Sequence, residues 1–180
     1  MVGEVYLSAA EIRTRVVELG AEIARDYADT EPLLVGALKA SLVFVADLSR
    51  ALPILHHLDF IELAGYGGDR GTGGHASIRF LKDLDVELAG RDVLIVEDVV
   101  DTGLTLRYLC RTFALRSPRS LAVATLLDRP YRRLVDDLPV RYVGFTVPDE
   151  LFVGYGFDLD ERFRNLPDVH VLGPALDKKS

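Results

Sequence analysis

The sequence predicts an α/β fold, a parallel sheet flanked by helices on both of its faces. Short, continuous apolar runs at residues 33–38 and 93–96 are typical of strands that are buried on both faces. Segments with helical spacing of apolar residues lie between the expected strands, and this alternation indicates a parallel sheet. The length of 180 residues suits one domain, and neither a repeat nor a linker divides residues 1–180.

The first half of the chain predicts two helices and three strands. Ser8 and Glu11 have the spacing of a capping box, so a helix is expected over residues 8–27. Its apolar positions keep the spacing of one helix face: Ile12, Val16, Leu19 and Ile23. A strand at 33–38 and a helix at 42–52 follow, and then strands at 58–63 and 77–81.

A glycine-rich segment separates these last two strands. Six of the eleven residues at positions 65–75 are glycine, so the segment has little intrinsic reason to hold one shape. Two interpretations stay open, a disordered loop or a flexible lid that becomes ordered over a substrate.

The second half of the chain predicts a strand at 93–96 that ends at Glu97, a helix at 104–115, and strands at 121–127 and 142–147. Cys110, the single cysteine, lies on an apolar helix stripe with Leu106, Leu109 and Phe113. We therefore expect a packed, inert thiol. The last residues, 177–180, are expected to form a solvated tail.

Charge and composition exclude several classes of protein. The net charge of -7 argues against nucleic-acid binding, since phosphate backbones are held mainly by Lys and Arg. A small phosphorylated substrate remains open, because backbone N–H groups can bind one in an acidic protein. The chain has no signal-peptide pattern and no apolar run of about 20 residues, so we expect a cytoplasmic protein without membrane contact. Its four histidines show no metal-ligand spacing.

The polar residues that follow the 93–96 strand suggest a ligand site. Glu97 and Asp98 stand at the carboxyl end of the strand, where open α/β sheets bind ligands, and sugar hydroxyls could bond to them directly or through a metal. A tight turn with Asp101 and Gly103 then opens a helix, whose first N–H groups suit a phosphate. Thr102 and Thr105 add hydroxyl donors, and Asp101 stands at the mouth of the pocket.

The acidic residues and the Asp-Thr-Gly sequence also allow interpretations other than a phosphate site. Acidic residues after a strand are common, and Asp101 could be a plain helix cap. The Asp-Thr-Gly sequence at 101–103 is also the signature of aspartic proteases. Those enzymes need an all-β context and a second catalytic aspartate. A helix follows here and no second signature occurs, so we discount that class.

Taken together, residues 93–105 resemble the phosphoribosyl-pyrophosphate motif of type I phosphoribosyltransferases. An apolar run, Glu-Asp, two apolar residues and Asp-Thr-Gly-x-Thr follow one another. Residues 38–48 resemble the first active-site loop of the hypoxanthine-guanine members, and further segments match at 81–84, 143–150, 153–158 and 162–167. The resemblance covers residues 8–172 and implies the type I fold with a small hood and a flexible lid.

The resemblance also implies a role for each site residue. Glu97 and Asp98 would face the ribose hydroxyls, and the 5′-phosphate would lie in the cradle Asp101, Thr102, Gly103, Leu104 and Thr105. Asp101 would be the catalytic base. The pyrophosphate contacts would be Lys39, Ala40 and Arg164, and Mg²⁺ would be held with help from Asp158, Glu97 and Asp98. The purine would meet Arg129, Leu151, Phe152 and Asp158, and Gly65 and Tyr66 would belong to the lid.

Several positions depart from the family pattern. Arg129 stands where a lysine usually meets the purine 6-oxo group, and Leu151 replaces the aromatic residue that stacks on the base. Phe152 could compensate for that loss. Arg129 could instead be a surface residue before a turn, and Leu151 could simply pack in the core. Gly65 replaces a serine, and Ala40 replaces a glycine in a loop that in some members has a non-proline cis bond before its lysine.

The activity implied is purine salvage: transfer of the 5-phosphoribosyl group from phosphoribosyl pyrophosphate to hypoxanthine and/or guanine, giving IMP or GMP and pyrophosphate. Two alternatives stay open, a related transferase that prefers xanthine or uracil, and a nucleotide-sensing regulator without turnover. The resemblance also implies a homodimer or homotetramer.

Overall fold

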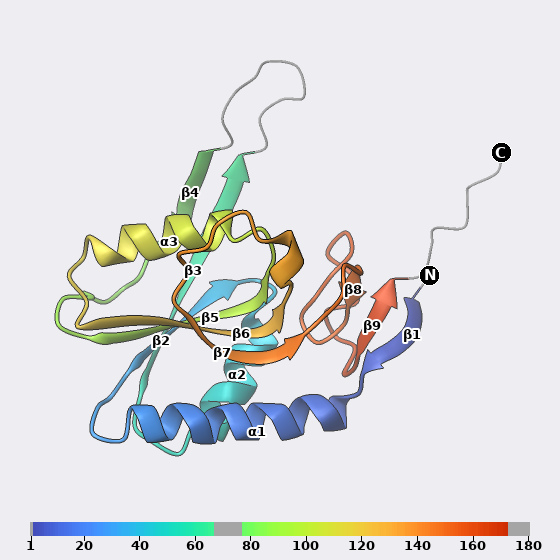
Figure 1. Ribbon diagram of the computed structural model, residues 1–180, viewed down its shortest axis with the longest axis horizontal. Coiled ribbons are helices and arrows are strands. Elements are labelled where there is room, and N and C mark those ends of the chain that lie inside the picture. Colours follow the sequence, from blue (N-terminus) through green and yellow to red (C-terminus); the bar gives the residue numbers. More distant parts are fainter. Residues whose placement is uncertain (1, 67–76, 173–180) are drawn as a thin grey trace.

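The computed structural model describes residues 2–66 and 77–172, and it confirms the predicted α/β fold (Figure 1). The main sheet has six strands in the order β4-β3-β2-β5-β6-β7, and every neighbouring pair in it is parallel except β3 with β4. In chain order the elements are β1 (Val2–Leu7), α1 (Ala9–Asp26), β2 (Leu33–Leu38), α2 (Leu42–Ala51), β3 (His57–Tyr66), β4 (Ser77–Lys82), β5 (Asp92–Val100), α3 (Leu104–Ala114), β6 (Ser120–Asp128), the 3₁₀ turn η1 (Pro130–Arg132), β7 (Val140–Thr146), β8 (Phe152–Val153) and β9 (Val169–Leu172).

Helices cover both faces of the main sheet, with α1 and α2 on one side and α3 on the other (Figure 1). Successive side chains of a strand point to opposite faces, so each buried strand supplies both layers. Leu94 and Val96 of β5 pack in the core with α1 and α2. Val93 and Ile95 pack in the core with α3. This double burial explains the continuous apolar runs in the sequence.

The start of α1 has the capping box that the sequence predicts. Ser8 Oγ accepts a hydrogen bond from the N–H of Glu11 at 3.3 Å. The carboxylate of Glu11 accepts one from the N–H of Ser8 at 2.9 Å. Two N–H groups that the helix itself leaves free are thereby satisfied.

Strand β5 extends farther than the sequence predicted. We expected it to end at Glu97, but it continues to Val100. Val99 and Val100 pair with Leu127 and Asp128 of β6, and such β-branched residues favour the extended backbone. Glu97 therefore lies inside the strand rather than after it.

A second sheet of three strands, in the order β1-β9-β8, forms the small hood that the resemblance implied. Its strands were not expected from pattern, because β1 is largely exposed and β8 has only two residues. The ring of Phe152 in β8 packs against that of Tyr6 in β1, with centroids 4.9 Å apart and the rings tilted by 46°. The hood thus brings the two ends of the described chain together.

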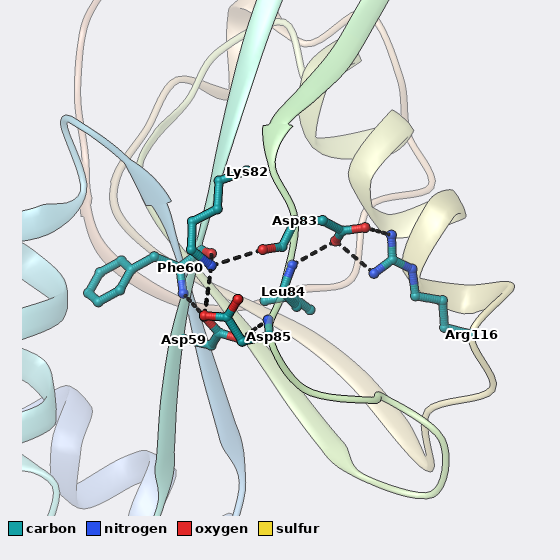
Figure 2. Close-up of polar contacts among 7 residues, drawn as sticks. All are labelled: Asp59, Phe60, Lys82, Asp83, Leu84, Asp85 and Arg116. Atoms are coloured by element: carbon teal, nitrogen blue, oxygen red, sulfur yellow. Dashed lines mark hydrogen bonds and ion pairs between the residues drawn. The ribbon is translucent and has the colours of Figure 1, made fainter.

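Charged residues fix the foot of the β3–β4 hairpin (Figure 2). Asp59 on β3 is buried and accepts a hydrogen bond from the N–H of Asp85 at 2.7 Å. Lys82 Nζ lies 3.3 Å from Asp59 Oδ1. Arg116, just after α3, donates two hydrogen bonds to Asp83, at 2.8 and 2.7 Å. The edge hairpin of the sheet is therefore joined to the helix on its face.

Two further expectations concern Cys110 and the membrane. The thiol is buried, and burial raises its pKa to about 12, which makes it unreactive as predicted. Among the described residues, no helix is long and apolar enough to cross a bilayer.

Asp92 at the start of β5 should give the fold a defined acid sensitivity. Hydrogen bonds from Arg119 hold its pKa at about 2, below the ordinary 3.8, and Ser120 contributes at 2.6 Å. A carboxyl group whose pKa is lowered in the folded state stabilises the fold at a pH above its ordinary pKa. This contribution is lost as the pH falls through the pKa of the folded state. We expect Asp92→Asn to lower the free energy of unfolding by about 2 kcal/mol near neutral pH.

Urea denaturation of wild type and variant between about pH 7 and about pH 3 measures this contribution. The difference in stability should be constant down to about pH 4 and shrink below it. Asp29→Asn, at an exposed turn, is the control. A difference that stays constant over the whole range would contradict the assignment.

Candidate active site

The loops that leave β5, β6 and β7 are hydrogen-bonded to one another at the carboxyl edge of the sheet. The N–H of Arg129, after β6, donates to the carbonyl of Val100 on β5 at 3.0 Å. The N–H of Val147, after β7, donates to the carbonyl of Asp128 at 2.9 Å. Side chains on three loops are thereby held at one place, where ligands of such sheets bind.

The turn between β5 and α3 forms a cavity. It has a volume of about 170 Å³, and its lining is Glu97, Val99, Val100, Asp101, Thr102, Gly103, Thr105 and Leu106. Gly103 has a φ of 80° and a side chain there would overlap Leu138 and Val135, so only glycine suits this position. It is the N-cap of α3 and has no capping side chain, while the N–H of Leu104 donates a long hydrogen bond to Thr102 Oγ1 at 3.4 Å. The other N–H groups of the first turn of α3 are therefore available to an anion.

Asp101 is not a helix cap, so that alternative is wrong: the cap is Gly103. Its Oδ1 atom is buried and, within the described part of the chain, accepts no hydrogen bond. Arg132 Nε lies 2.9 Å from Oδ1, close enough for an ion pair, but without hydrogen-bond alignment. Arg129 lies on the other side, with a terminal nitrogen 3.8 Å from Oδ2. Asp101 thus has two cations beside it, and its Oδ1 atom can still accept a hydrogen bond.

Glu97 and Asp98 lie in different surroundings. Glu97 lines the cavity at the start of α3, whereas Asp98 feels the charges of Arg164 and Asp158. Burial raises the pKa of Glu97 well above its ordinary value, and the charge of Asp98 raises it further. Burial also raises the pKa of Asp98, to about 6. Both carboxyl groups are held where a cation or hydroxyl donors would lower the cost of ionisation.

Arg129 is not a surface residue, so that alternative is wrong too: only 7 % of it is exposed. It donates a hydrogen bond to the carbonyl of Glu150, and its guanidinium lies 5.4 Å from the ring centroid of Phe152. Leu151 is 62 % exposed, so it does not pack in the core. Phe152, in the hood strand β8, is buried and contacts both Arg129 and Tyr6.

The loop after β2 meets the segment after β8. The Leu38–Lys39 peptide bond is cis, the feature that some members of the resembled family have before their lysine. Lys39 Nζ forms an ion pair with Glu161 at 3.0 Å. Arg164 pairs with Asp158 at 2.8 Å and with Glu161 at 3.2 Å. Lys39 is therefore brought into one cluster of charges with Asp158 and Arg164, which lie far from it in the sequence.

This segment is also unusual in its backbone. Asp160, Glu161 and Phe163 all have positive φ, at 52°, 62° and 75°. Such conformations cost free energy for residues other than glycine, and they cluster at functional sites. Ala40 and Gly156 touch across the two loops, because a side chain at Gly156 would overlap the carbonyl oxygen of Ala40.

The remaining site residues are only partly described. Leu104, the first residue of α3, is half exposed, and its N–H donates a long hydrogen bond to Thr102 Oγ1 at 3.4 Å. The predicted lid at 65–75 lies largely outside the described residues. For Gly65 and Tyr66 the backbone alone is described, at the end of β3.

Two residues at the site were not singled out from the sequence, Arg132 and Glu161. Arg132 lies in η1 and contacts Asp101, and Glu161 joins Lys39 to Arg164. The sequence did hold a signal for Arg132, because three arginines fall at 129, 132 and 133, directly after the strand predicted at 121–127. Glu161 stands three residues from both Asp158 and Arg164, a spacing that carries no signal by itself.

Comparison with known proteins agrees with this geometry. The family model of the phosphoribosyl transferase domain matches residues 4–161. The chain is 44 % identical over 173 residues to the hypoxanthine-guanine phosphoribosyltransferase of Bacillus subtilis, covering 96 % of this chain and 94 % of that protein. It is 47 % identical over 168 residues to the hypoxanthine phosphoribosyltransferase of Salmonella typhimurium, covering 92 % and 93 %.

Solved structures show the same likeness. A hypoxanthine-guanine phosphoribosyltransferase from Bacillus anthracis superposes with a TM-score of 0.89 at 41 % identity, over 96 % of this chain and 99 % of that one. A hypoxanthine phosphoribosyltransferase from Staphylococcus aureus gives a TM-score of 0.91 at 36 % identity, over 99 % and 95 %. The chain belongs to the phosphoribosyl transferase family. Within that family, the relatives named above are transferases of the hypoxanthine and hypoxanthine-guanine type.

The close approach of Gly156 to Ala40 generates a test of how the site is built. Gly156 has a φ of 98°, and an added side chain would overlap backbone rather than a mobile side chain. Gly90 has a similar φ of 72° but nothing within 4 Å of an added side chain. Gly90→Ala should therefore cost only the conformational strain, about 1–2 kcal/mol.

Gly156→Ala carries the same strain and the overlap with Ala40, so we expect about 1–3 kcal/mol of further destabilisation. Urea denaturation of the two variants gives the comparison. Equal losses in both variants would show that the two loops are not packed as described.

Proposed function

We propose that the protein transfers the 5-phosphoribosyl group from phosphoribosyl pyrophosphate to hypoxanthine or guanine, giving IMP or GMP and pyrophosphate, and so salvages purines. One observation carries the proposal beside the family membership. A buried carboxylate oxygen of Asp101 with no hydrogen bond stands next to the start of α3, where the N-cap Gly103 has no side chain to cap the helix. A general base and a phosphate site are thereby adjacent.

The phosphoribosyl half of the substrate is assigned to the turn after β5. The 5′-phosphate lies in the cavity at the start of α3, where the N–H groups of residues 102–105 and the hydroxyls of Thr102 and Thr105 donate to it. Glu97 and Asp98 accept hydrogen bonds from the ribose hydroxyls. Burial disfavours the ionised form of both carboxyl groups, and hydrogen bonds from the ribose hydroxyls would stabilise that form.

Pyrophosphate is assigned to the cluster that joins the two loops. Lys39 and Arg164 supply positive charge, and the backbone of Ala40, the residue after Lys39, lies against Gly156. As the bond from the anomeric carbon to pyrophosphate breaks, these cations stabilise the growing charge of the leaving group. Glu161 now pairs with both cations, so it must release them when pyrophosphate binds.

The donor set fits Mg²⁺, which we propose as cofactor. Glu97, Asp98 and Asp158 offer carboxylate oxygens, the ligands that Mg²⁺ takes. In the described residues no group of three or more His, Cys, Asp or Glu side chains could hold a metal ion by itself. Mg²⁺ commonly uses one or two carboxylates together with substrate phosphates. Bound in this way, the ion would neutralise charge on the leaving group.

The purine edge is assigned to Asp101 and Arg129. A 6-oxopurine presents an oxygen acceptor at position 6 beside an imidazole N–H donor. Arg129 donates to the oxygen, and the free Oδ1 of Asp101 accepts the imidazole proton as the opposite ring nitrogen attacks the sugar. Adenine would turn an amino donor toward Arg129, which accepts nothing. Phe152 supports Arg129 from beneath, Leu151 is exposed beside the base, and Asp158 adds charge nearby.

We further propose that residues 1–180 act as one domain in a cytoplasmic homodimer or homotetramer, with the glycine-rich segment that includes Gly65 and Tyr66 as a lid. The support is the family resemblance. Light scattering on the purified protein decides the oligomeric state.

A base panel tests the function directly. The protein is incubated with Mg²⁺, phosphoribosyl pyrophosphate and each of hypoxanthine, guanine, xanthine, adenine and uracil, and nucleotide formation is followed. We expect turnover with hypoxanthine or guanine and none with adenine. Nucleotide binding without turnover would instead indicate a regulator. Turnover confined to xanthine or uracil would show that the substrate is one of those bases and not hypoxanthine or guanine.

Asp101→Asn should keep the fold and lose most of the rate, because an amide cannot accept the purine proton. General-base catalysis typically contributes about 10²- to 10⁴-fold, so we expect kcat to fall within that range. Steady-state kinetics with hypoxanthine give the measurement, and a circular dichroism melt controls for folding. Wild-type turnover in this variant would remove Asp101 from the mechanism.

Substitutions of Arg129 test the base contact. A hydrogen bond to a charged group is worth about 1.5–3 kcal/mol when a partner is removed, so Arg129→Met should raise the KM for hypoxanthine about 10- to 100-fold. Arg129→Lys keeps the charge and should lie between wild type and Met. The KM for phosphoribosyl pyrophosphate in the same variants is the internal control. If only that KM changes, Arg129 does not contact the base.

A further inference from the structure

We infer that Arg132 is a positioning residue for the base-transfer reaction: it holds the Asp101 carboxylate in place by tying it to Asp149 on the loop after β7. The inference rests on the proposed function and assigns a role to a residue outside the phosphoribosyltransferase motifs described above. Arg132 is not among the residues that line the phosphate cavity, and it does not belong to the pyrophosphate cluster as defined above.

The geometry of the Arg132 side chain carries the argument. Its Nε lies 2.9 Å from Asp101 Oδ1, and a terminal nitrogen donates a hydrogen bond to Asp149 Oδ1 at 2.8 Å. The planar guanidinium presents several N–H groups in a fixed fork, so it can engage two carboxylates at once. Arg132 therefore bridges two loops, one that carries the general base and one that leads into the base pocket.

The backbone around Arg132 gives the fork a fixed origin. Arg132 ends η1, a short turn that begins at Pro130. The N–H of Arg132 donates to the carbonyl of Arg129 at 3.1 Å, and the N–H of Leu134 donates to the carbonyl of Thr102 at 2.9 Å. The turn is thus bonded to the same loop that carries Asp101. The reach from Arg132 to Asp101 is set by this backbone and not by a free side chain alone.

The orientation of the Arg132 N–H explains how Asp101 can act as a general base although a cation lies beside it. The Arg132 N–H does not point along a lone pair of Oδ1, so that oxygen attracts the guanidinium without accepting a hydrogen bond. The purine N–H can therefore still bind there. Loss of Arg132 would leave the carboxylate facing Arg129 alone, at 3.8 Å. The carboxylate would then turn away from the purine, and misplacement by about 1 Å can cost about 10²-fold in rate.

Arg133, the next residue in the chain, has a different partner from Arg132. Arg133 pairs with Asp128, on its own side of the turn, and packs against Gly103. Its charge is already matched within the β6 loop. Arg132 is the one of the two that reaches across to Asp101.

The test uses kinetics of four variants of the full chain. Arg132→Gln should lower kcat for hypoxanthine about 10- to 100-fold while the KM for phosphoribosyl pyrophosphate changes less than about threefold. Arg132→Lys should recover part of kcat, because it keeps the charge but not the fork. Asp149→Asn should lower kcat less, since it removes only the anchor. The double variant Arg132→Gln/Asp149→Asn should be no slower than Arg132→Gln, because residues that act as a unit are not additive.

Arg141→Gln is the matched control. Arg141 is also a half-exposed arginine paired with an aspartate, Asp26 at 2.9 Å, but it lies at the start of β7, away from the site. We expect it to keep wild-type kcat, and thermal melts compare the folding of all variants. If Arg132→Gln does not fold, Arg132→Lys and Asp149→Asn carry the test.

Three outcomes would overturn the inference: wild-type kcat in Arg132→Gln, additive losses in the double variant, or a rise confined to the KM for phosphoribosyl pyrophosphate. The last would make Arg132 a substrate ligand. If wild type itself forms no nucleotide with any base, the proposed function fails first, so the two failures are distinguishable.

Discussion

The parallel pairing of β5 with β6 is the interaction on which the site depends. Asp92 pairs with Ser120 at one end, and Val100 pairs with Asp128 at the other. Because the strands are parallel and in register, the next residue of each leaves the sheet at the same edge. Asp101 and Arg129 are therefore neighbours, although 28 positions separate them in the sequence. A shift of one residue would exchange the two faces of a strand and separate this pair.

The same strand pairing also holds an ionisable side chain, Glu97, in buried surroundings where its charged form is unfavourable. Glu97 lies within a strand whose preceding residues are fully buried, and its carboxyl group gains from whatever ligand arrives. The cations proposed to bind pyrophosphate are already matched, Arg164 with Asp158 and Lys39 with Glu161. The free protein thus holds these two cations in ion pairs that a polyanionic substrate can replace.

Much of the fold follows from local pattern. The apolar run of β2 and the capping box of α1 gave their bounds to within a residue, because periodicity and capping act on neighbouring residues. The end of β5 was missed, since Val99 and Val100 extend the strand by pairing with β6, a partner that local pattern does not reveal. The hood was expected from resemblance alone, as its strands are short or exposed.

The candidate site divides in the same way. The Glu97–Thr105 stretch is contiguous, so the sequence displays it whole. The bridge from Asp101 through Arg132 to Asp149 joins three loops, and only the folded chain brings them together. Similarly, the close approach of Gly156 to Ala40 is a backbone contact, and the residue types at these positions do not predict it.

The single buried cysteine makes the protein a convenient object for spectroscopy. Because the Cys110 thiol is shielded and its pKa is about 12, maleimide reagents should leave it unmodified in the folded state. Two cysteines introduced at exposed positions would then be the only reactive thiols of the folded chain. Paired fluorophores or spin labels can be attached without first removing a native residue, so distances between chosen loops can be followed during turnover in an otherwise unaltered chain.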